Sequence, residues 1–261
     1  MLGAIIGDIV GSIYEFNNHK SKEFELFGKG CSFTDDTVHT IAVADWLLNR
    51  EANGPGLTDR LVHWSNKYPH CSYGGMFRQW LSGREYEGKY EPYGSYGNGS
   101  AMRVSPCGWY VNSEQDAIEV ATSSAEVTHS HPQGILGAQA VALAIFKARM
   151  GCSTEDIREA VLDFSKYDLT QTVDEIRPNY HFDETCQGTV PQAIICALNA
   201  TSFEDAIRNA ISIGGDSDTV AAITGSIAEA MFGIPKDIRE KALHYLPDEM
   251  IDIVFGGSNY V

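Results

Sequence analysis

Two short acid-rich segments lie near opposite ends of the chain and share one pattern. In residues 213–225 a glycine pair precedes two aspartates, a serine and a threonine, and an apolar helical pattern follows. In residues 34–41 the run Asp36-Thr37-Val38 with Ile41 repeats the spacing of Asp218-Thr219-Val220 with Ile223. Either segment alone is best interpreted as a helix cap that satisfies free N–H groups and complements the helix dipole. Together they offer hard oxygen ligands of the kind that Mg²⁺ or Mn²⁺ prefers, so the hypothesis is a two-metal site.

The rest of the chain reads as one helix after another, and no segment shows a convincing alternation typical of strands. Residues 84–96 read as a loop, and residues 168–185 read as an extended excursion. No linker is evident, so the sequence predicts an all-α fold, a compact orthogonal helical bundle with a single domain over residues 1–261. One expected helix starts in the acid motif of residues 34–41 and carries Val38, Ile41, Ala42 and Leu48 on one face. The other expected helices cover residues 3–15, 61–68, 74–81, 113–125, 133–150, 154–164, 190–198, 203–213, 219–232, 236–246 and 248–255.

The first expected helix combines an apolar face with a glycine stripe. Gly3, Gly7 and Gly11 recur every four residues, which lets a second helix approach closely. Asp8 and the short length favour a buried helix in a soluble bundle over a membrane span. Glu15 falls at or just past the helix end, where the dipole opposes an acid, so we expect a cationic group nearby.

Composition limits the partners. With 19 basic and 35 acidic residues the formal charge is -16, which argues against a nucleic-acid backbone as partner. A small anionic ligand would need metal ions or helix N-termini to balance its charge. We expect no signal peptide and no membrane span, and the six scattered cysteines fit reduced thiols in a cytoplasmic protein.

Two further segments could bind a ligand. The loop from Gly94 to Arg103 contains three glycines that let backbone N–H groups approach an anion, although a plain surface loop is the simpler interpretation. Residues 128–132 carry two histidines just before a helix. A hydrogen bond from His129 to a substrate is more plausible than metal ligation, and a capping and packing role for the segment is about as plausible.

These motifs, taken together and in order, resemble those of the ADP-ribosylglycohydrolase family, which includes the dinitrogenase reductase-activating glycohydrolases. The resemblance spans nearly the whole chain. The motifs that carry it are Gly7-Asp8 through Glu15, Thr34-Asp35-Asp36-Thr37, Gly94-Ser95-Tyr96-Gly97-Asn98-Gly99 with Met102-Arg103, Thr128-His129, and Gly214-Gly215-Asp216-Ser217-Asp218-Thr219.

The resemblance implies that two Mg²⁺ or Mn²⁺ ions assist cleavage at the anomeric carbon of the distal ribose of an ADP-ribose conjugate. Glu15 would be the acid or base, and Asp36 would join it as a catalytic residue. The implied metal ligands are Thr34, Asp35, Asp36, Asp216, Asp218 and Thr219, with Ser217 pointing elsewhere. The implied substrate contacts are Gly94, Ser95, Tyr96 beside the adenine, Gly97, Asn98, Gly99 and His129.

Two other functions stay open at this stage. The family includes lens crystallins, so the fold can persist as a non-catalytic or ADP-ribose-binding protein. A two-metal pyrophosphohydrolase would instead cleave the diphosphate. The sequence does not distinguish arginine-linked, serine-linked and O-acetyl substrates, and it does not indicate an oligomeric state.

Overall fold

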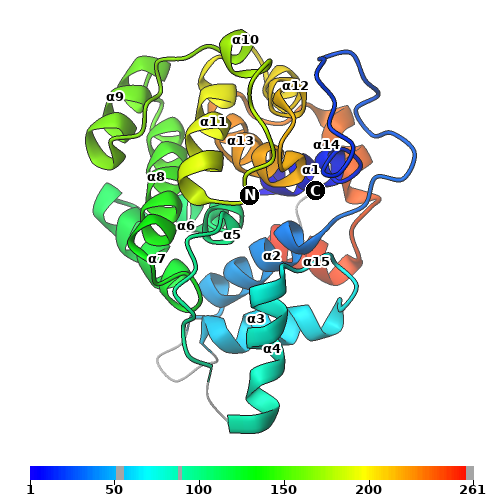
Figure 1. Ribbon diagram of the computed structural model, residues 1–261, viewed down its shortest axis with the longest axis vertical. Coiled ribbons are helices and arrows are strands. Elements are labelled where there is room, and N and C mark those ends of the chain that lie inside the picture. The colour runs from blue at the N-terminus through cyan, green and yellow to red at the C-terminus, as the bar shows by residue number, and fades with distance from the viewer. Residues whose placement is uncertain (51–55, 88–89, 257–261) are drawn as a thin grey trace.

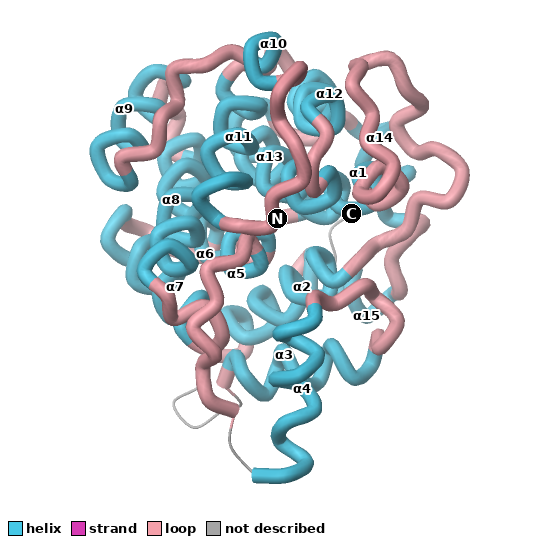
Figure 2. Tube along the Cα trace, in the orientation of Figure 1, coloured by secondary structure: helices cyan, strands magenta, loops and turns pink. Residues whose placement is uncertain are grey.

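A computed structural model of the protein describes residues 1–50, 56–87 and 90–256. These residues form helices joined by loops, with no strand among them (Figure 2), which confirms the all-α prediction. The helices are α1 (Leu2–Gly11), α2 (Asp35–Leu48), α3 (Leu57–Lys67), α4 (Gly75–Glu87), α5 (Gly99–Met102), α6 (Ser105–Trp109), α7 (Glu114–Glu126), α8 (Pro132–Arg149), α9 (Thr154–Ser165), α10 (Val173–Ile176), α11 (Cys186–Leu198), α12 (Phe203–Ile213), α13 (Ser217–Phe232), α14 (Lys236–Leu243) and α15 (Asp248–Val254).

Helix α13 is the centre of the bundle. Every residue from Ser217 to Ala228 is buried, and α13 packs against α1, α8, α11 and α12 (Figure 1). Beyond its first turn, most of its buried residues are apolar or small, as expected for a helix that is buried on all sides. Its first turn carries Asp218, so the acid motif begins inside the core.

The glycine stripe of α1 lies directly against α13, so a second helix does approach closely there. A Cβ added to Gly3 would lie 2.2 Å from the carbonyl oxygen of Gly225, and a Cβ added to Gly7 would lie 2.0 Å from the carbonyl oxygen of Ala221. At Gly11 it would lie 2.4 Å from the Cα of Asp218. Side chains have no room here, so the two backbones touch and the register of α1 on α13 is fixed.

Several boundaries differ from the sequence prediction. Helix α1 ends at Gly11, four residues before Glu15, because the Ser12 hydroxyl donates to the carbonyl of Ile9 and the chain turns there. Helix α4 continues to Glu87, so the predicted loop over 84–96 is wrong at its start, and residues 88–89 lie outside the described part. Helix α3 begins at Leu57, four residues before the start expected at residue 61.

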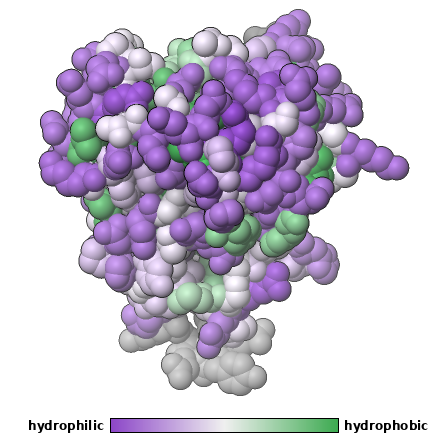
Figure 3. All heavy atoms as spheres, turned by 45° about the horizontal axis from the view of Figure 1, so that its top comes forward, coloured by the Kyte–Doolittle hydropathy of each residue, from purple (hydrophilic) through white to green (hydrophobic). Residues whose placement is uncertain are grey.

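Long segments without regular structure, chiefly residues 12–34 and 177–185, run over the surface beside the bundle. The face turned toward the viewer in Figure 3 is mostly hydrophilic, with apolar side chains in small separate groups, as expected for a strongly acidic chain. None of the described helices combines the length and apolar character needed to cross a membrane. All six cysteines are free thiols.

Candidate active site

The carboxylate of Asp8, in α1, fixes the start of α2. Its carboxylate accepts hydrogen bonds from the backbone N–H of Thr34 at 2.9 Å and of Thr37 at 3.1 Å, and from both threonine hydroxyls. Asp8 is fully buried, and its burial raises the pKa of the carboxyl although the four hydrogen bonds oppose that rise. Asp8 therefore holds α2 in place rather than facing a ligand.

Asp36, in the first turn of α2, meets the first turn of α13. Thr219 Oγ1 donates to Asp36 Oδ1 at 3.3 Å, while Asp36 Oδ2 is buried without any hydrogen-bond partner. Burial raises the pKa of the Asp36 carboxyl well above its usual range, and the carboxylates of Asp218 and Asp8 raise it further. The same causes raise the pKa of the partly exposed Asp35.

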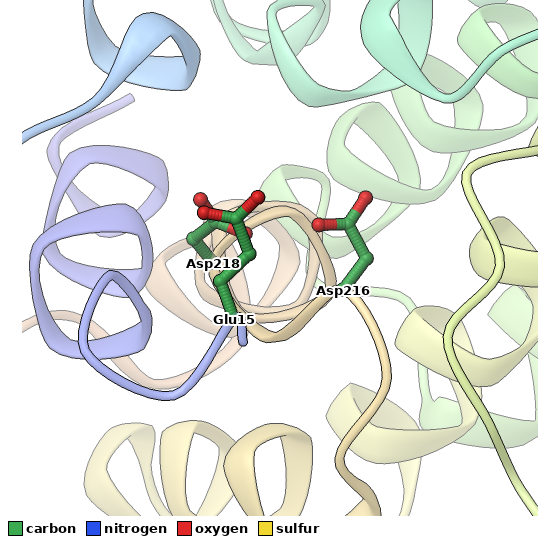
Figure 4. Close-up of side chains that lie close together, drawn as sticks. All are labelled: Glu15, Asp216 and Asp218. Carbon is green, nitrogen blue, oxygen red and sulfur yellow. The ribbon is translucent and has the colours of Figure 1, made fainter. Parts of the chain in front are cut away.

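Glu15 lies over the α13 end of the site. Oxygen atoms of Glu15, Asp216 and Asp218 lie within 4.8 Å of one another, and Figure 4 shows the Glu15 and Asp218 carboxylates side by side with Asp216 next to them. Burial raises the pKa of Glu15 to about 8, with contributions from Asp218, Asp8 and Glu184. The charges nearest to Glu15 in the described chain are thus carboxylates, and the expected cationic group is not among them.

The glycine pair before α13 is needed for its conformation. Gly214 and Gly215 have φ of +69° and +81°, a region that side chains disfavour. Asn18 clamps this turn, because its side chain accepts from the N–H of Gly215 at 2.7 Å and donates to the carbonyl of Gly215 at 2.9 Å. The clamp ties the segment after Glu15 to the residue before Asp216.

The capping interpretation holds for one acid motif and not for the other. Thr34 is the N-cap of α2, and its hydroxyl accepts from the N–H of Asp36 at 3.4 Å. Asp216 occupies the N-cap position of α13, yet its side chain caps no backbone group. Instead, Asp216 Oδ2 accepts from the side-chain amide of Asn98 at 2.7 Å, which orients the carboxylate.

The glycine-rich loop forms the neighbouring wall, but part of it is already bonded within the protein. The N–H of Gly97 donates to Ser95 Oγ at 3.0 Å, and the N–H of Asn98 donates to the carbonyl of Glu184 at 2.7 Å. These two backbone donors are therefore not free for a ligand. Tyr96 is 49% exposed and its ring lies 5.2 Å from that of His131.

The two histidines of residues 128–132 have separate roles. His131 caps α8, since its Nδ1 accepts from the N–H of Gln133 at 3.1 Å. His129 is buried in the pocket wall, where burial and the nearby Arg103 cation lower the pKa of its imidazole well below the usual range. His129 is therefore neutral at physiological pH.

A single pocket collects most of the predicted residues. Of the predicted site residues, Thr34, Gly94 and Tyr96 are not part of its wall. Ser217, which was predicted to point elsewhere, is also outside the wall, and its hydroxyl donates to the carbonyl of Gly215 at 3.3 Å. The wall contains Glu15, Asp35, Asp36, Ser95, Gly97, Asn98, Gly99, His129, Asp216, Asp218 and Thr219.

Sequence reasoning missed several contributors to this pocket. Glu184 comes from the extended excursion, and His39 and Tyr93 also line the wall. Arg103, quoted only as part of a motif, is completely buried there. The sequence alone does not indicate this burial, because an arginine next to a glycine-rich loop is ordinarily expected at the surface.

The donor set fits divalent cations. Buried carboxylates are ordinarily paired or bound to metal, and the pKa values of Asp36, Asp218 and the partly exposed Asp35 are raised by desolvation and by neighbouring carboxylates. The buried, unpartnered Asp36 Oδ2 is the clearest sign, because a native structure rarely leaves such an atom unsatisfied. Oxygen-only ligands of this kind suit Mg²⁺ or Mn²⁺.

Fold and pocket together define an all-α protein with a pocket partly lined by carboxylates. The family model of ADP-ribosylglycohydrolase matches residues 1–255, so the chain belongs to the ADP-ribosylglycohydrolase family and the predicted resemblance is confirmed.

Individual relatives agree with this membership. The ADP-ribosylhydrolase ARH3 of Homo sapiens is 27% identical over 310 residues, covering 90% of this chain and 84% of that one. The ADP-ribosylarginine hydrolase Tri1 of Pseudomonas putida (strain GB-1) is 26% identical over 265 residues, covering 90% and 70%. A solved "ADP-ribosylglycohydrolase-related protein complex" chain shares the fold with a TM-score of 0.71 at 23% identity, covering 98% of this chain and 94% of that chain.

Proposed function

We propose that this protein is a metal-dependent hydrolase that cleaves the glycosidic bond at the anomeric carbon of the distal ribose in ADP-ribose conjugates and releases ADP-ribose. The observation that carries the proposal is the convergence of buried carboxylates from α2 and α13 on one pocket, with Asp36 Oδ2 left unpartnered. Family membership supplies the substrate class. The six free thiols suit the reducing cytoplasm, where we place the activity.

Asp35 and Asp36 would hold the cations from one side, and Asp216, Asp218 and Thr219 from the other. When bound, two divalent ions would orient the ribose hydroxyls and a water molecule and make that water more acidic. Asn98 keeps Asp216 turned toward the pocket through its 2.7 Å hydrogen bond. The Thr34 hydroxyl donates to Asp8 at 2.7 Å, so it contributes mainly by holding the first turn of α2.

Glu15 would handle the proton. A carboxyl whose pKa lies near the working pH can both give and take a proton. In the metal-free protein the pKa of Glu15 is raised to about 8, and bound cations would lower it from that value. Protonation of the leaving group and removal of a proton from water are the two steps that glycosidic hydrolysis asks of such a group. Glu15 lies beside Asp218, so it faces the same region of the pocket as the cation ligands.

The test is a turnover screen with Mg²⁺ or Mn²⁺ on arginine-linked, serine-linked and O-acetyl ADP-ribose, with the products identified. Free ADP-ribose is the expected product from at least one conjugate. AMP with ribose phosphate would identify a pyrophosphohydrolase, and tight ADP-ribose binding without turnover would identify a non-catalytic binding protein. Asp35→Ala and Asp218→Ala should each lose both bound metal and hydrolysis, and retention of both would refute the metal-site assignment.

A further inference from the structure

A continuous chain of hydrogen bonds runs behind the pocket wall and joins Arg103, Thr128 and His129. Arg103 Nη2 donates to the carbonyl of Ser124 at 2.7 Å and to Thr128 Oγ1 at 2.8 Å. Thr128 Oγ1 lies 2.8 Å from His129 Nδ1. All of these side chains are buried, so water does not compete for the bonds.

The direction of this chain follows from the chemistry of its members. A guanidinium only donates, so Thr128 Oγ1 must accept from Arg103. Tyr93 also interacts with Thr128, and burial raises the pKa of Tyr93, so the phenol keeps its own hydrogen and need not take the one that Thr128 carries. The single hydrogen of the Thr128 hydroxyl is then available for His129 Nδ1.

The opposite arrangement is electrostatically unfavourable. If His129 carried its hydrogen on Nδ1, that N–H dipole would point toward the Arg103 cation through the threonine oxygen. With Nδ1 of His129 as the acceptor, its lone pair points toward the Arg103 cation. The bond from Arg103 to Thr128 then polarises the Thr128 hydroxyl and strengthens its bond to Nδ1. The lowered pKa of His129 keeps the ring neutral, so only one nitrogen carries hydrogen.

Nε2, the other ring nitrogen of His129, faces the glycine-rich loop that contains Gly97 and Gly99. A Cβ added at Gly99 would lie 3.0 Å from His129 Nε2, and one added at Gly97 would lie 3.8 Å from it. No hydrogen bond to Nε2 is formed within the described residues, while the histidine lines the pocket. Nε2 is therefore placed to bond whatever lies against the glycine loop.

We propose that Arg103 is a positioning residue that acts through Thr128 to hold His129 with its hydrogen on Nε2, where His129 donates to an oxygen of the bound ligand. The proposal rests on the proposed function only for the identity of that ligand, ADP-ribose, whose phosphate oxygens accept hydrogen bonds. The tautomer itself is a property of the free protein and can be measured without turnover.

The primary test is long-range ¹H–¹⁵N NMR of the protein with ¹⁵N-labelled histidine, with the His129 signals assigned by loss in His129→Gln. We expect hydrogen on Nε2 and none on Nδ1, unchanged from about pH 6 to 8. Hydrogen on Nδ1 in the wild-type protein would overturn the proposal, whether or not any variant folds.

The hydrogen bonds that join Arg103, Thr128 and His129 form a relay. Thr128→Val and Thr128→Ser separate an effect of this relay from an effect of simple packing. Thr128→Val removes the hydroxyl and should give a mixture of tautomers, whereas Thr128→Ser keeps the hydroxyl and should restore the single form. Arg103→Met should resemble Thr128→Val, with melting temperatures showing that the compared variants are folded. Thr122→Val is the matched control, because the Thr122 hydroxyl bonds the carbonyl of Ile118 and the side chain of Gln139, and none of these three residues lines the pocket.

Calorimetric binding of ADP-ribose with Mg²⁺ gives the second readout. Thr128→Val should weaken binding roughly three- to tenfold, the effect of one hydrogen bond, while Thr128→Ser and Thr122→Val should bind as the wild type does. A folded Thr128→Val protein with the wild-type tautomer and affinity would refute the relay. If every conjugate resists hydrolysis while the tautomer is as stated, the proposed function fails and the relay stands.

Discussion

At the scale of single residues, Asp8 has a structural role within an acidic site. Asp8→Asn should lower the free energy of unfolding by about 2–4 kcal/mol, because an amide cannot accept all four hydrogen bonds from Thr34 and Thr37. Urea unfolding measures this change. The exposed Asp163→Asn on α9 is the control and should change stability by less than about 0.5 kcal/mol. Equal stability of the two variants would contradict the role assigned to Asp8.

Glu15 should affect turnover rather than folding. Glu15→Gln keeps the size of the side chain but removes the proton donor and acceptor, so kcat should fall by about 10²–10⁴-fold. Glu23→Gln, an exposed glutamate in the same segment, should keep wild-type turnover. Steady-state kinetics on the preferred conjugate compare the two, and full activity of Glu15→Gln would remove Glu15 from the reaction.

The sequence predicted the acids that form the pocket better than it predicted their partners. Repeated spacing in two motifs singled out Asp36, Asp218 and Thr219, and the structure brings all three together. The bond from Asn98 to Asp216 joins residues 118 positions apart, and no local pattern encodes such a contact. For the same reason, the Arg103 relay is visible only in three dimensions.

At the scale of elements, the contact between α1 and α13 should tolerate no added carbon. Gly7→Ala would place a Cβ 2.0 Å from a backbone oxygen of α13, so the helices must separate, and we expect a loss of about 3 kcal/mol or more. The matched control is Gly83→Ala in α4, where no atom lies within 4 Å of the added Cβ. There alanine should stabilise by about 0.5–1 kcal/mol. Thermal or urea unfolding of both variants should therefore give effects of opposite sign, and equal effects would contradict this packing.

Helices could be predicted where apolar periodicity and capping residues agreed, whereas the residues at which helices begin and end were predicted less well. The capping box of Ser153 and Asp156 begins α9, and Pro132 occupies the first position of α8, so both helices start within one residue of the predicted bounds. The apolar pattern past Gly11 suggested a longer α1 because Ile13 keeps helical spacing, yet Ile13 packs on the core from a turn. Tertiary packing thus continued an apolar face without continuing the helix.

At the scale of the whole molecule, the site is assembled from segments at both ends of the chain. The motif at residues 34–41 meets the motif at 213–225 because α1 lies on α13 and Asp8 holds α2 against them. Periodicity alone predicts neither contact. Family resemblance predicted that the motifs share one site, and the glycine stripe is the only local feature that anticipated how the helices touch.

The raised pKa values make the stability of the metal-free protein depend on pH. A carboxyl whose pKa is higher in the folded state stabilises the fold fully below its unfolded pKa, and this stability is lost as pH rises through the folded value. The pKa of Asp216 is about 6 and that of Glu15 about 8, while Asp35, Asp36 and Asp218 are also raised. The melting temperature in EDTA should therefore fall as the pH rises from about 5 to 8.

Bound divalent cations should reverse this trend. Mg²⁺ or Mn²⁺ binds the ionised carboxylates and competes with their protons, so the stabilisation by metal should grow as the pH rises. Scanning calorimetry with EDTA or with Mg²⁺ at several pH values measures both effects. Added NaCl is the control, because salt screens the surface repulsion that a charge of -16 produces but leaves buried pairs largely unscreened. If NaCl removed the pH dependence as fully as Mg²⁺ does, the dependence would come from surface charge and not from the buried site.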